Sequence, residues 1–77
     1  MALTKEPLYA TIARNLAQRI SSKEFPVGSL LPTEQQLCRE YDVSRHTIRE
    51  ALRELSDIGL VSRKKHVGTT VEKLKPV

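Results

Sequence analysis

The chain has 77 residues, of which 39% are hydrophobic and 29% are charged, with one Phe, two Tyr and no Trp. This length allows one domain, and a chain of this size buries only about 60% of the surface that its unfolded form exposes. We therefore expect a small aliphatic core without room for a deep catalytic cavity. Thirteen Lys and Arg against nine Asp and Glu give a net charge of +4, which favours a polyanionic partner.

The cysteine and histidine content excludes several classes of site. One cysteine and two histidines provide neither an internal disulfide nor a zinc-binding framework. The apolar runs are at most three residues long, whereas a membrane-spanning helix needs about 20, and residues 1–6 lack the apolar segment of a signal peptide. We therefore expect a cytoplasmic protein that has no contact with a membrane and holds neither a metal nor a cofactor.

The first predicted element is an amphipathic helix with Pro7 in its first turn, where a missing N–H costs nothing. Its apolar stripe recurs with helical spacing and consists of Tyr9, Ile12, Ala13, Leu16 and Ile20. The opposite, solvent-facing side carries Arg14, Asn15, Gln18 and Arg19. Residues 25–28, which contain Pro and Gly, then predict a turn.

A second, short helix is predicted to begin after Thr33, which has the spacing of a capping box with Gln36. The helix is then broken, because Asp42 is a poor helix former, Val43 is buried and Ser44 caps the following helix. The buried side of this second helix is expected to consist of Leu37, Cys38 and Tyr41. The single cysteine is therefore interpreted as a buried structural thiol and not as a nucleophile.

The third predicted helix covers residues 45–58 and ends at Gly59, which is free to adopt a positive φ. Two short β-prone runs around the basic turn 64–68 then predict a hairpin. The expected fold class is therefore mainly α with a small β-hairpin, in the order of three helices and then the hairpin. The core stripe of the third helix is expected to be Ile48, Ala51, Leu52, Leu55 and Ile58.

The second and third helices, separated by three residues, have the helix-turn-helix arrangement, in which the second helix enters the DNA major groove by its N-terminal end. Arg45, Arg49 and Arg53 are four residues apart and share one face of the helix. Arginine is well shaped for guanine, and a helix N-terminus suits a phosphate. The residues expected to face outward near the helix start are Arg45, His46, Thr47 and Arg49.

Simpler interpretations stay open for these charges. Glu50, Glu54 and Asp57 lie on the same helix, and such a row is often only a solvated, salt-bridged surface. The first turn nevertheless holds basic residues and no acid, a cost to the helix that a phosphate partner would offset. The basic residues 64–66 are either a solubilising turn or a DNA-binding wing. No nucleophile with a base and an acid, and no glycine-rich phosphate loop, is present, so we do not expect an enzyme.

An ordered set of motifs resembles the GntR-type winged helix-turn-helix domain of bacterial transcription regulators over residues 7–71. The motifs are L-Y-A-T-I-A at 8–13, F-P-V-G-S-L at 25–30, L-P-T-E-Q-Q-L at 31–37, V-S-R-H-T-I-R-E-A-L at 43–52, G-L-V at 59–61 and G-T-T-V at 68–71. The resemblance implies a recognition helix at about 45–58 in the major groove and a wing at about 62–70 near the minor groove. It also implies a short strand around residues 29–30 that pairs with the wing.

The expected DNA-binding residues combine the outward helix positions with those that the resemblance implies. They are Thr33, Gln35, Ser44, Arg45, His46, Thr47, Arg49, Lys65, His66 and Gly68. Two positions depart from the family pattern. Gln35 stands where the family commonly has a base-reading arginine, and His66 stands where the wing commonly has a glycine that lets the backbone approach DNA. We therefore expect a different operator preference at Gln35 and altered wing contacts.

The resemblance also implies the organisation of a longer protein, in which residues 72–77 begin a linker to a C-terminal domain that this chain does not contain. That domain would bind a small-molecule effector and hold a homodimer together, although some family members carry an aminotransferase-like domain instead. The homodimer would read a short palindromic operator, commonly built on a GT…AC core, most often as a repressor. The alternative is a winged-helix module that uses its third helix to bind protein.

Overall fold

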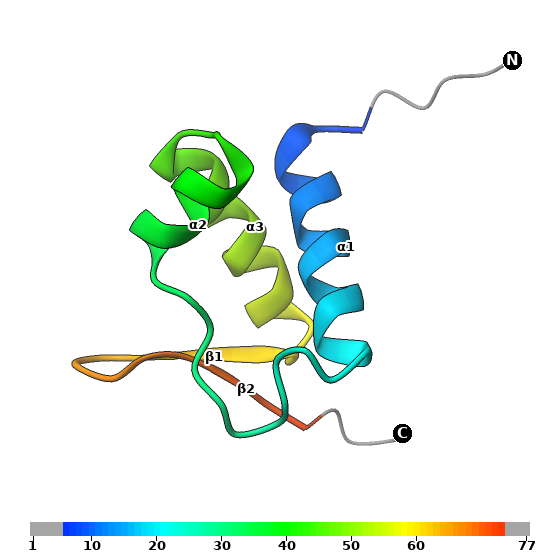
Figure 1. The fold of residues 1–77 in the computed structure, drawn as a ribbon, viewed down its shortest axis with the longest axis vertical. Coiled ribbons are helices and arrows are strands. Elements are labelled where there is room, and N and C mark those ends of the chain that lie inside the picture. The colour runs from blue at the N-terminus through cyan, green and yellow to red at the C-terminus, as the bar shows by residue number, and fades with distance from the viewer. Residues whose placement is uncertain (1–5, 74–77) are drawn as a thin grey trace, which may run out of the picture.

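The computed structural model describes residues 6–73 as three helices followed by a two-stranded antiparallel hairpin that lies across one end of the helices (Figure 1). This arrangement confirms the expected fold class, mainly α with a small β-hairpin. The elements are α1 (Leu8–Ser21), α2 (Glu34–Tyr41), α3 (Arg45–Asp57), β1 (Val61–Lys64) and β2 (Gly68–Val71). None of the described helices is long and apolar enough to cross a membrane.

The helix boundaries follow from local capping. Thr33 Oγ1 accepts a hydrogen bond from the Gln36 N–H at 3.1 Å, and Gln36 Oε1 accepts one from the Thr33 N–H at 2.8 Å, so the expected capping box is confirmed. Ser44 Oγ accepts from the Thr47 N–H at 3.2 Å and caps α3. Pro7 is the residue that precedes α1, one position earlier than expected.

The turn between α2 and α3 is as short as the sequence predicts. Asp42 adopts a left-handed conformation with φ 55°, which ends α2, and the Val43 N–H donates to the Cys38 carbonyl at 3.1 Å. Ser44 then begins the next capped helix. A side chain in the left-handed region is uncommon, but Asp tolerates it better than most residues.

Apolar faces of all three helices and the hairpin meet in one core. Its members are Ile12, Ala13, Leu16, Ile20, Leu31, Leu37, Ile48, Ala51, Leu52, Leu55, Leu60, Val61 and Val71. Tyr9, Cys38, Tyr41 and Val43 are half-buried and pack against this core. The expectations that Cys38, Tyr41 and Val43 are buried are therefore corrected, because α2 is short and turns only Leu37 fully into the core.

Ile58 is a second correction. It is 58% exposed and lies outside the core stripe to which its spacing assigned it. The helix ends at Asp57, and Ile58 already has ψ near 0° as the C-cap. Ten residues at about 100° per residue also carry this position about 80° away from Ile48, to the edge of the stripe. Gly59 follows with φ 82°, as expected of a helix stop.

The segment before α2 adds a third strand-like partner to the hairpin. Within the hairpin, Val61 faces Val71 and Lys64 faces Gly68. Leu30 forms a bridge with Thr70, and the Leu31 N–H donates to the Thr69 carbonyl at 2.8 Å. The expected pairing of residues 29–30 with the wing is therefore present, although as a single bridge and not as a strand, and it joins the entry of α2 to the hairpin.

Arg19 is a correction to the solvent-facing side of α1. Its side chain is only 20% exposed and forms ion pairs with Glu24 and Glu40. It also donates to the Tyr41 hydroxyl at 2.9 Å and lies 4.6 Å from the centre of the Phe25 ring. Hydrogen bonding to Glu24, the largest influence, raises the pKa of Arg19 further above its ordinary value. This guanidinium therefore links α1 to α2 in charged form.

The end of the domain lies beyond β2. The Glu72 N–H donates to the Leu60 carbonyl at 2.8 Å, and the Glu72 carboxylate accepts from Thr70 Oγ1 at 2.9 Å. Of the expected linker 72–77, residues 74–77 lie outside the described part of the chain. Glu72 itself is thus still bonded to the folded domain.

Leu16→Ala is expected to lower the free energy of unfolding by about 2–5 kcal/mol, because Leu16 is fully buried and truncation leaves a cavity. Leu8→Ala is the matched control: Leu8 is 56% exposed on the same helix and should cost less than about 0.5 kcal/mol. Urea denaturation followed by circular dichroism measures both. Equal losses would mean that α1 does not pack in the way described.

Candidate nucleic-acid interface

An open groove of about 650 Å³ runs between the entry to α2, the start of α3 and the hairpin. It is lined by residues 30–35, by Arg45, and by residues 63–65 and 67–69 of the hairpin. Five of the expected site residues meet in this lining, although they come from three separate parts of the chain. They are Thr33, Gln35, Arg45, Lys65 and Gly68.

The groove is predominantly basic. Arg45, Arg63, Lys64 and Lys65 line it against a single acid, Glu34. Arg63 and Lys64 belong to β1, whereas Arg45 is the first residue of α3, so the positive charge is assembled from elements distant in sequence.

Within residues 6–73, no group of three or more His, Cys, Asp and Glu residues is placed to hold a metal ion.

The start of α3 presents polar groups next to this groove. Its first turn contains no acid, and both Arg45 and His46 are exposed. Ser44 accepts from the Thr47 N–H and its hydroxyl lies 3.0 Å from that of Thr47. Ser44 therefore acts first as the helix cap, while the N-terminal end of α3 keeps the positive dipole that suits an anion.

The arginine row on α3 is not a salt-bridged surface within the helix. Among residues 6–73, no ion pair joins Arg45, Arg49 or Arg53 to an acid of the same helix. Arg49 instead reaches across to Glu34 of α2, with Nε 3.3 Å from Oε1. Of the simpler interpretation, a solvated and salt-bridged surface, the structure contains no pairing along α3 within the described residues, whereas the three arginines are solvent-exposed.

Glu34 and Arg63 line the groove but were not among the residues that the sequence pointed to. Arg63 Nη2 lies 2.5 Å from Glu34 Oε2, so one carboxylate holds an arginine of α3 and another of β1. In the sequence, Glu34 is an acid in the first turn of α2, a position that is explained by a favourable interaction with the helix dipole. This explanation does not predict two arginine partners. For Arg63, the sequence indicated only that it belongs to a short strand, and no pattern indicated a partner for its side chain.

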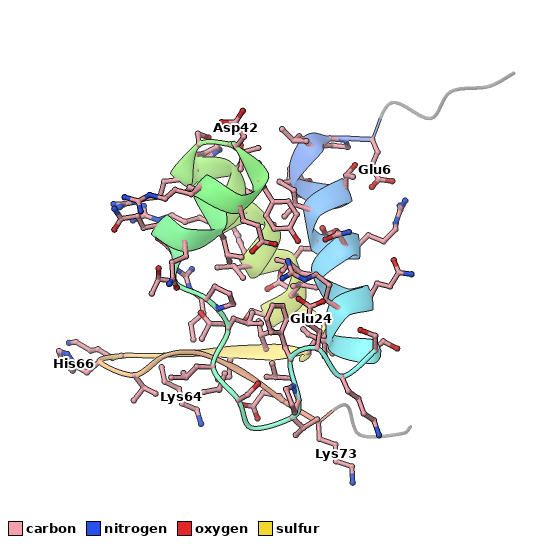
Figure 2. The ribbon with its side chains drawn as sticks, viewed as in Figure 1. Glu6, Glu24, Asp42, Lys64, His66 and Lys73 are labelled. Carbon is pink, nitrogen blue, oxygen red and sulfur yellow. The ribbon has the colours of Figure 1, made fainter. Side chains whose placement is uncertain are left out.

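At the tip of the hairpin, His66 occupies the position where the resembled family commonly has glycine, and its backbone conformation is the one that glycine favours. His66 adopts a left-handed conformation with φ 67°, and Gly68 has φ 118°. The Val67 N–H donates to the Lys64 carbonyl at 3.1 Å and closes the turn. Figure 2 places the exposed His66 at the outer end of the hairpin, away from α1. The backbone therefore keeps a glycine-like shape and adds an imidazole to it.

Comparison with known proteins places most of the chain in one family. The family model described as "Bacterial regulatory proteins, gntR family" matches residues 8–71. The chain is 40% identical over 68 residues to the "Probable fructoselysine utilization operon transcriptional repressor" of Escherichia coli K12, covering 88% of this chain and 28% of that protein. It is 41% identical over 69 residues to the "Histidine utilization repressor" of Pseudomonas putida, covering 90% of this chain and 28% of the relative.

Solved structures share the same fold. AraR(DBD) in complex with operator ORR3 superposes with a TM-score of 0.86 at 31% identity, covering 92% of this chain and 86% of that one. The Listeria innocua protein lin2111 has a TM-score of 0.80 at 39% identity, covering 91% of this chain and 31% of that one. This chain spans less than a third of the length of these curated relatives.

The backbone conformation at His66 leads to a stability prediction. His66→Val should lower the free energy of unfolding by about 1–2 kcal/mol, because a β-branched residue is strained at positive φ. His66→Gly should leave it within about 1 kcal/mol of the original, since relief of strain offsets the greater freedom of the unfolded chain. Thermal unfolding compares the two variants. If His66→Val were as stable as His66→Gly, the left-handed turn would be wrong.

Proposed function

This chain belongs to the gntR family of bacterial regulatory proteins, and we propose that it binds double-stranded DNA sequence-specifically as the operator-binding module of a transcriptional repressor. The observation that carries this proposal is the basic groove beside the exposed, acid-free first turn of α3. It is supported by the similarity, at a TM-score of 0.86, to AraR(DBD) in complex with an operator. Relatives that are named repressors support the regulatory role.

In the proposed complex, α3 enters the major groove by its first two turns. Arg45 and Thr47 contact base edges there, Arg49 contacts a phosphate, and Ser44 and His46 lie beside them. A good bidentate pair between arginine and guanine contributes about 1–3 kcal/mol of discrimination. Phosphate contacts by Arg and Lys provide most of the sequence-independent affinity. The apolar side of α3 holds these groups in place because it is buried in the core.

The entry to α2 and the hairpin complete the proposed contact surface. Thr33 and Gln35 line the same groove as Arg45, and Gln35 hydrogen-bonds well with adenine or with a phosphate. Lys65, His66 and Gly68 approach the minor groove from the hairpin. His66 presents its side chain at the tip where a glycine would present only backbone. We therefore propose an operator that differs from the common family pattern at the base next to Gln35.

The assembly of the whole protein is part of the same proposal. Two copies joined by a C-terminal domain would place two α3 helices on a palindromic operator about one helical turn apart. A small-molecule effector bound by that second domain would change the spacing of the two modules. Because bacterial DNA lies in the cytoplasm, the proposed regulator is located there.

The first experiment is fluorescence anisotropy with a palindromic GT…AC duplex and a scrambled duplex of equal length, repeated over a range of salt concentrations. The expected result is tighter binding to the palindrome with a steep fall of log K against log salt, because neutralised phosphates release counterions. Absence of binding to either duplex at low salt would reject DNA binding and favour a protein-binding module.

Arg45→Ala should weaken binding to the preferred duplex by about 1–3 kcal/mol and barely change binding to the scrambled one, because a base contact is lost. The comparison variant is Lys64→Ala/Lys65→Ala, which should flatten the salt dependence on both duplexes because phosphate contacts are lost. The same anisotropy assay measures both variants. An equal loss on both duplexes for Arg45→Ala would reassign this residue to a phosphate.

A further inference from the structure

Glu34 lies at the junction of the three elements that form the proposed contact surface. It is the first residue of α2, and its side chain is only 23% exposed although it is charged. Oε1 accepts from Arg49 Nε at 3.3 Å, and Oε2 accepts from Arg63 Nη2 at 2.5 Å. A single carboxylate therefore joins α2 to both α3 and β1.

Both arginines keep most of their hydrogen-bonding capacity after this pairing. A guanidinium has five N–H donors, and Arg49 uses only Nε while Arg63 uses only Nη2 for side-chain hydrogen bonds among residues 6–73. Their side chains remain 55% and 46% exposed. The carboxylate thus restricts where each guanidinium lies and leaves other donors turned to solvent.

A carboxylate among these cations also affects every approaching phosphate. Glu34 is the one acid in the lining of a basic groove, and a like charge near DNA reduces affinity for any sequence. A correctly placed backbone can still use the donors that Arg49 and Arg63 leave free. Without the pairing to Glu34, the two arginines could instead bind phosphates in many positions and therefore on DNA of any sequence.

We propose that Glu34 is a specificity-determining positioning residue: it holds Arg49 of the recognition helix and Arg63 of the wing in one fixed arrangement and so suppresses binding to non-operator DNA. This inference rests on the proposed function and adds a residue that contacts no base. Its signature is one substitution that raises affinity for non-operator DNA and leaves affinity for the operator nearly unchanged.

The test compares Glu34→Gln with Glu54→Gln, in anisotropy titrations with the preferred duplex and the scrambled duplex. Glu54→Gln is the charge-matched control, because Glu54 is exposed on α3 and forms no ion pair within the described residues. A third variant, Glu34→Asp, keeps the charge but shortens the side chain by one methylene. Thermal unfolding of each variant establishes that the fold is kept.

Glu34→Gln is expected to raise affinity for the scrambled duplex by about threefold to tenfold and to lower the ratio of specific to non-specific affinity by a similar factor. On the scrambled duplex the slope of log K against log salt should steepen by up to about 1.8, because two released arginines would each neutralise a phosphate at about 0.9 per contact. Glu34→Asp should lower the ratio with a smaller rise in non-specific affinity. Glu54→Gln should change the ratio by less than twofold.

Three results would overturn the inference. They are an unchanged ratio for Glu34→Gln, an equal shift for Glu54→Gln, or a loss of thermal stability with both affinities falling together, which would leave Glu34 as a stabiliser of α2 alone. Failure of the unsubstituted chain to distinguish the two duplexes would instead count against the proposed operator. The salt slope on scrambled DNA still tests Glu34 in that case.

Discussion

Burial of one side of α3 is the constraint on which the rest of the structure depends. Ile48, Ala51, Leu52 and Leu55 are at most 2% exposed, and each large side chain contributes about 1.5–3 kcal/mol by leaving water. The fully buried Ala51 allows close approach of the packed helices. Because the apolar stripe is held by α1, α2 and the hairpin, the rotation of α3 about its axis is settled, and with it the direction of every polar side chain at its start.

At the start of α3, positively charged side chains lie at the positive end of the helix dipole, which is electrostatically unfavourable. A helix N-terminus prefers acids, yet its first turn holds Arg45 and His46 and no acid. Both arginines of α1 are paired: Arg19 binds Glu24 and Glu40, and Arg14 binds Glu6. Beside the groove, by contrast, Glu34 is the one acid in a lining that contains Arg45, Arg63, Lys64 and Lys65, and this excess of positive charge is physical support for an anionic partner at that surface.

The hairpin acts as an extension of the helical unit. Backbone bonds from residues 29 and 31 attach the α2 entry to β2, while Glu34 connects that same entry to α3 and β1 through side chains. The two proposed DNA-reading elements are therefore joined by two different kinds of interaction at one point of the chain. A module built in this way can place its helix and its wing on DNA together, with little additional ordering on binding.

The sequence by itself determined the three helices, the capping box, the helix-turn-helix and the hairpin, because each depends on periodicity or capping within a few residues. The resemblance to a family supplied the pairing of residues 29–30 with the hairpin, which is a single bridge in the structure and which no local pattern indicated. Only the tertiary structure decided the half-buried state of Arg19, the exposure of Ile58 and the two arginine partners of Glu34. Those partners lie 15 and 29 residues away along the chain. Such pairings depend on how the packed helices and hairpin are placed relative to one another, and a short-range pattern carries no information on that distance.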